Sequence, residues 1–106
     1  MDEIVVLVTA GSEAEATSIA NALVGQGLVA CVNILPGIRS IFQWEGKVAQ
    51  ENEYLLLAKT VNQAFERVAA AVKSLHSYDV PEVIALPITK GLPEYLRWVR
   101  DVTSAV

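Results

Sequence analysis

The fold is decided by the stretch from Ala30 to Thr60, ACVNILPGIRSIFQWEGKVAQENEYLLLAKT, which predicts a long β-hairpin. Glu45-Gly46 is a short turn signal between two apolar-polar runs. Pro36-Gly37 is predicted to interrupt the first arm. Each arm is about twice as long as an ordinary strand of roughly five to six residues. Because so small a domain cannot cover such a ribbon with its own helices, we expect the ribbon to pack against another chain.

The composition predicts one domain, over residues 1–106, that associates with itself. Hydrophobic residues make up 53% and charged residues 19%, and this apolar excess is typical of a buried subunit interface. The net charge of −4 argues against nucleic acid as a partner.

The single cysteine rules out an intrachain disulfide and a CxxC metal knuckle, and it favours a reducing, cytoplasmic setting. The acidic Met1-Asp2-Glu3 start lacks the basic region of a secretory signal. The apolar run from Ile4 to Val8 is too short to span a membrane, so no membrane partner is expected.

The first unit is a buried strand at Glu3–Ala10 followed by a helix. Ser12 and Glu15 fit a capping box at the helix start. Gly25 and Gly27 end the helix, one of them in a left-handed C-cap. The next strand is predicted to start near Leu28, directly after these glycines.

The second unit repeats this order after the hairpin. Thr60 and Gln63 are a candidate capping box for a second helix that fades near Leu75. The residues of its apolar stripe are Phe65, Val68, Ala69, Val72 and Leu75.

A last strand is predicted over Val80–Ile88, where two prolines confine it to a sheet edge or an irregular path. Pro93 opens a short third helix. The residues of this helix expected to pack inward are Tyr95, Leu96, Val99 and Val102.

The order βαβ-βαβ plus a C-terminal helix predicts an α+β fold, the ferredoxin-like sandwich. In this fold a four-stranded antiparallel sheet carries two helices on one face. The other face has no helix assigned to it except the third, and an exposed apolar sheet face invites self-association.

Two residues are candidate metal ligands. Cys31 is either a small buried hydrophobe or a soft ligand. His76 is either a helix-end residue that offsets the helix dipole or a ligand without a local HxH or HxxxH partner. One cysteine and one histidine cannot complete a tetrahedral site within one subunit without carboxylates or neighbouring chains.

Four residues of the hairpin could serve an interface or a cleft. Glu51 is expected to keep the ribbon soluble, whereas Glu53 could equally flank a cleft. Lys59, at a strand end, is either solvated or holds an anion. Trp44 at the hairpin tip is expected to be buried on a neighbouring chain.

Three runs, ACVNILPGIRSIFQWEGKV, ENEYLLLAKT and HSYDVPEVIALPI, closely resemble the CutA family of divalent-cation tolerance proteins. The resemblance covers nearly the whole chain. It implies a ferredoxin-like protomer in a tight homotrimer, with long hairpins that wrap neighbouring subunits. It also implies an architecture similar to that of the trimeric PII signalling proteins.

The resemblance carries over to individual positions. Ser77 stands where the family has proline, and Asp79 stands where it has glutamate, so the reach of that carboxylate is shorter by one methylene. The matching residues are Cys31 in ACVN, Trp44 and Lys59 in the hairpin, and His76, Tyr78 and Glu82 around the last strand.

Together with these observations, the resemblance implies a non-enzymatic, homotrimeric protein of divalent metal-ion tolerance or response, copper above all. Metal would bind at inter-subunit sites through Cys31 and His76, with no cofactor required. The alternative is a PII-like regulatory module that binds a small anionic ligand in the inter-subunit cleft. The residues assigned to that cleft are Trp44, Glu53, Lys59, Tyr78, Asp79 and Glu82. A third hypothesis is a small cleft enzyme with Glu53 or Glu82 as the base.

Overall fold

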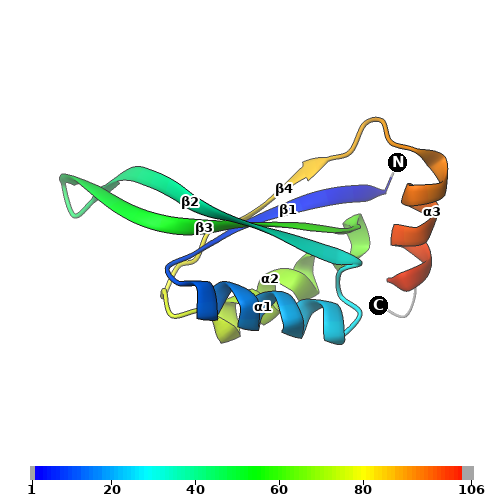
Figure 1. Cartoon of the computed structure of the whole chain (residues 1–106), viewed down its shortest axis with the longest axis horizontal. Coiled ribbons are helices and arrows are strands. Elements are labelled where there is room, and N and C mark those ends of the chain that lie inside the picture. The colour runs from blue at the N-terminus through cyan, green and yellow to red at the C-terminus, as the bar shows by residue number, and fades with distance from the viewer. Residues whose placement is uncertain (1, 104–106) are drawn as a thin grey trace.

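The computed structural model describes residues 2–103, which form a four-stranded antiparallel sheet and three α-helices (Figure 1). The strand order is β2-β3-β1-β4, and every neighbouring pair is antiparallel. This arrangement confirms the predicted α+β sandwich. The elements are β1 (Glu3–Ala10), α1 (Glu13–Gly25), β2 (Cys31–Trp44), β3 (Lys47–Val61), α2 (Phe65–Leu75), β4 (Val83–Pro87) and α3 (Pro93–Val102), with a 3-10 turn at Asn62–Ala64.

The β2–β3 hairpin is present as predicted and extends well beyond the helices (Figure 1). Glu45 and Gly46 both have positive φ, 50° and 78°, as a two-residue turn of the I′ kind requires. As predicted, Pro36-Gly37 interrupts the pairing of the first arm. β2 continues through a bulge between Leu35 and Ile38. Because β2 lies at the sheet edge, the proline there breaks no inner ladder.

The start of α1 follows its sequence signal. The Ser12 hydroxyl accepts a hydrogen bond from the Glu15 backbone N–H at 3.1 Å. Gly27 has a φ of 71° just beyond the helix. The next strand begins at Cys31 rather than near Leu28, because the Leu28 N–H bonds back to the last turn of α1.

The predicted capping box at Thr60 and Gln63 is wrong. Thr60 lies within β3, fully buried, and its hydroxyl donates to the Leu28 carbonyl at 2.7 Å. Ala64 is the N-cap of α2 and provides no side-chain bond. The helix ends at Leu75 as predicted, although Leu75 itself is exposed.

β4 is an edge strand, shorter than the predicted Val80–Ile88. Pro93 occupies the first turn of α3 as expected. Leu96 and Val99 are buried. Tyr95 and Val102 were also expected to pack inward, but they are about two-fifths exposed. The inward face of α3 is therefore narrower than its apolar pattern predicted.

The two faces of the sheet differ in their cover. On the face that α1 and α2 pack against, hereafter the covered face, Val6, Val8 and Leu56 have no exposed surface. The alternating residues point to the opposite face. We call the apolar part of that surface the open face; its residues are Val5, Leu7, Leu35, Leu55, Leu57, Ile84 and Leu86. Leu35, Ile84 and Leu86 are about half exposed there.

Candidate functional site

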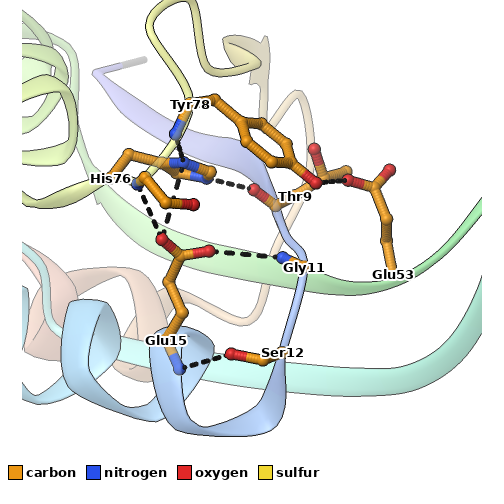
Figure 2. A network of polar contacts seen from close by, with 8 residues as sticks. Thr9, Gly11, Ser12, Glu15, Glu53, His76 and Tyr78 are labelled. Atoms are coloured by element: carbon orange, nitrogen blue, oxygen red, sulfur yellow. Dashed lines mark hydrogen bonds and ion pairs between the residues drawn. The ribbon is translucent and has the colours of Figure 1, made fainter.

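A polar network closes the sheet where β1 ends (Figure 2). His76 caps the C-terminus of α2 and is buried. Its Nε2 lies 2.7 Å from the Thr9 carbonyl oxygen, and its Nδ1 accepts the Tyr78 backbone N–H at 3.0 Å. This pattern requires a neutral imidazole with its proton on Nε2, since Nδ1 must accept. Both ring nitrogens are therefore already occupied.

Glu15 joins this network from α1. Its carboxylate accepts from the Ser77 N–H at 2.7 Å and from the Gly11 N–H at 3.3 Å. Burial alone would raise the pKa of Glu15. The hydrogen bonds that the carboxylate accepts from Ser77 and Gly11 outweigh burial and hold that pKa below its usual value. The Glu15 carboxylate thus ties three segments of the chain together.

Tyr78 extends the network to the hairpin (Figure 2). Its hydroxyl donates to the Glu53 carboxylate at 2.8 Å, and Glu53 is only 6% exposed. Burial and the bond to that carboxylate raise the pKa of Tyr78 to about 12, so the phenol keeps its proton. A side chain at Gly11 would meet the Tyr78 hydroxyl at 3.2 Å, so a larger residue there would press on the Tyr78–Glu53 pair.

A second cluster lies at the other end of the sheet, beside α3. The Cys31 sulfur is 3.4 Å from the Tyr95 hydroxyl. That hydrogen bond, with burial, raises the pKa of Tyr95 to about 12. Lys59 pairs with Cys31 across the ladder, and its Nζ donates to the Asn33 side chain and to the Leu57 carbonyl.

The fold does not bring the two candidate metal ligands together within one subunit. Cys31 is opposite Lys59, while Thr9, the partner of His76, is opposite Leu55. These positions, Leu55 and Lys59, are four residues apart along β3, about 13 Å at the usual strand rise. Within residues 2–103 no group of three or more His, Cys, Asp or Glu side chains could hold a metal ion.

The residues assigned to a cleft are spread over the protomer. Glu53 and Tyr78 meet, but Lys59 lies at the far end of the open face. Trp44 is 63% exposed at the hairpin tip. Asp79 and Glu82 are exposed around the chain segment before β4, and the Asp79 backbone carbonyl accepts a bond from Lys73.

Sequence reasoning missed three contacts that shape these clusters. Glu15 was identified only as a capping residue, yet it reaches Ser77, 62 positions away. Tyr95 was assigned to packing and not to a bond with Cys31. Glu3, placed in a buried strand, forms an ion pair with Arg100 at 3.0 Å. None of these contacts has a local sequence signal, because each joins segments that meet only in the folded chain.

Comparisons with known proteins agree with one another. The family model described as CutA1 divalent ion tolerance protein matches residues 4–102. The divalent-cation tolerance protein CutA of Thermus thermophilus is 52% identical over 96% of this chain and 99% of its own length. The solved structure of the divalent cation tolerance protein (Cut A1) from that organism has a TM-score of 0.94 and covers 95% of this chain and 98% of that one. The chloroplastic CutA of Arabidopsis thaliana is 48% identical over 94% of this chain, which spans only 55% of that relative.

Proposed function

The chain belongs to the CutA1 divalent ion tolerance family, and from this we propose that it acts in cation tolerance as a non-enzymatic homotrimer. The observation that carries the proposal is the open face. Half-exposed leucine and isoleucine side chains at Leu35, Ile84 and Leu86 form an apolar surface that nothing within residues 2–103 covers. Such a surface is typical of a protein interface.

The hairpin gives a second reason for self-association. Its tip carries Ile41, Trp44 and Val48, which are 59%, 63% and 72% exposed. The helices do not reach this part of the ribbon (Figure 1). A neighbouring copy that packs against the open face and receives the hairpin would bury both surfaces. A trimer follows the architecture that the family resemblance implies.

Light scattering tests the trimer directly. Three chains of 11.4 kDa give about 34 kDa at low micromolar concentration, and a mass of one chain would overturn the proposal. Trp44→Ala should weaken association, because buried tryptophans are frequent hot spots. Arg67→Ala, an exposed change on α2, is the matched control and should leave the mass unchanged.

We propose that metal binding, copper first, takes place between subunits. Cys31 lies beside the open face, where a neighbour can supply further ligands, and thiolate is the preferred ligand of reduced copper. His76 can join a metal only by giving up its bond to Thr9 or to Tyr78. Cys31 is accordingly the stronger of the two candidates.

Calorimetry with copper on wild type, Cys31→Ser and His76→Ala tests this site. Cys31→Ser should bind copper at least tenfold more weakly than wild type. His76→Ala should lose less copper affinity than the cysteine variant. Wild-type affinity should fall as pH drops, because the ligands must lose protons to bind. Equal affinity and equal pH dependence in all three proteins would overturn the proposal.

The alternative function, a PII-like module for a small anion in the inter-subunit cleft, is favoured by one observation. Lys59 stands on the same side of the sheet as the open face, where Asn33 and the Leu57 carbonyl hold its ammonium group. A thermal-shift comparison separates the functions, because a ligand specific to the folded state raises Tm. Stabilisation by nucleotides and not by copper would favour this alternative.

We also propose that the protein works in the cytoplasm, where its free Cys31 would stay reduced. No helix within residues 2–103 is long and apolar enough to cross a membrane. One similar plant protein is named as chloroplastic. Cell fractionation with an antibody to the chain tests the location.

A further inference from the structure

A groove between α3 and the loop before it gathers much of the chain's positive charge. The groove has a volume of about 420 Å³, and its charged lining residues are Lys90, Arg97 and Arg100. The whole chain has only eight lysines and arginines against twelve acidic residues. Three of the eight cations thus meet in one groove on an otherwise acidic protein.

The cations differ in how far they are neutralised. Within residues 2–103, Lys90 and Arg97 form no ion pair. Arg100 donates to the buried Glu3 carboxylate at 3.0 Å. Its side chain is nevertheless 47% exposed and lines the groove. Three positive charges less the one Glu3 carboxylate leave a net charge of about +2 at the groove.

The groove is held in shape by its own walls. Arg97 and Arg100 are three residues apart on α3 and therefore neighbours on one helix face. Glu3 fixes Arg100 from the start of β1, next to α3 (Figure 1). On the loop side, a side chain at Gly91 would meet Leu96 at 3.0 Å, so the loop backbone lies directly against α3.

We propose that this groove binds a small phosphate-bearing anion, a phosphate ester or diphosphate. Arginine guanidinium groups bind phosphate oxygens in pairs, and lysine adds a compact charge. A phosphate dianion also matches the net charge of the groove. The site is separate from the inter-subunit cleft assigned to Lys59, which lies on β3.

Calorimetry of the full chain with inorganic pyrophosphate at 50 mM salt tests the site. We expect saturable binding, at least fivefold weaker in Arg97→Gln and in Lys90→Gln. Arg67→Gln removes an exposed cation from α2 and is the matched control, with less than twofold change expected. Affinity should also fall as salt rises, because exposed charges are screened.

Four results would overturn the inference. The first is no saturable binding at millimolar pyrophosphate. The second is an equal loss in the Arg67 control, which would indicate a general charge effect. The third is a loss of pyrophosphate affinity in Lys59→Gln while Arg97→Gln keeps wild-type affinity, which would place the anion in the inter-subunit cleft. The fourth is succinate binding as tightly as pyrophosphate, which would show that the groove does not select phosphate.

Discussion

The covered and open faces of the sheet are built from the same strands, yet the apolar side chains of one face are buried and several of those on the other are exposed. Val6 and Val8 are completely buried under two helices, whereas Ile84 and Leu86 on the other face are about half exposed. Both sets are apolar. The difference teaches that, within residues 2–103, α1 and α2 cover one face and leave the middle of the other open, which is where our proposal places other copies.

The open face is closed at its two ends by different means. At one end Tyr95 of α3 lies against Cys31, and at the other Tyr78 lies against Glu53. The pleat places Glu53 on the same side of β3 as Leu55 and the rest of the open face. Only the apolar middle is left for a partner.

The largest contrast should come from leucines on the two faces. Leu56→Ala, on the covered face, should lower the free energy of unfolding by about 2–5 kcal/mol, because it leaves a cavity. Leu86→Ala removes a half-exposed side chain and should act through association. Its effect on Tm should grow as the protein is diluted.

Thermal melts at several protein concentrations measure both effects. A loss of stability in Leu86→Ala that is independent of concentration and as large as that of Leu56→Ala would break the comparison. The open face would then belong to the fold of the single chain and not to an assembly.

A smaller effect is expected at the Tyr78 end of the open face. Tyr78→Phe leaves the buried Glu53 carboxylate without its hydroxyl donor and should cost about 1–3 kcal/mol. Tyr54→Phe is the matched control, since the Tyr54 ring packs on the core but its hydroxyl has no hydrogen bond within residues 2–103. Equal denaturant midpoints for the two variants would show that the Glu53 bond contributes nothing.

The smallest effect concerns acid. The pKa of Glu15 is lower in the folded chain than its ordinary value of 4.5, so its stabilisation is complete above that value. It is lost as pH falls below 4.5 and through the folded pKa. Glu15→Gln should therefore lose less stability than wild type between pH 5 and pH 3.

Glu13→Gln, an exposed change in the same turn of α1, is the control and should follow wild type. Denaturant melts at each pH give the slopes. Parallel curves for wild type and Glu15→Gln would show that the bonds from Ser77 and Gly11 do not depend on the charge.

The sequence predicted most of the fold, because many of its signals act within a few residues. Ser12 capped α1, Glu45-Gly46 made the hairpin turn, and Pro93 opened α3, each where its local chemistry suits it. The order of the elements along the chain also predicted that no helix except the third would lie on the second face of the sheet.

The tertiary structure decided which polar groups find partners. Thr60 had the sequence of a helix cap, but the Leu28 carbonyl, 32 residues away, became its acceptor. The candidate metal ligands also have partners that come from distant parts of the sequence. Both ring nitrogens of His76 take part in hydrogen bonds, one of them to Thr9, and the Cys31 sulfur lies near the Tyr95 hydroxyl. The physical reason is that a donor bonds to whichever acceptor folding buries beside it, and a partner tens of residues away leaves no local pattern.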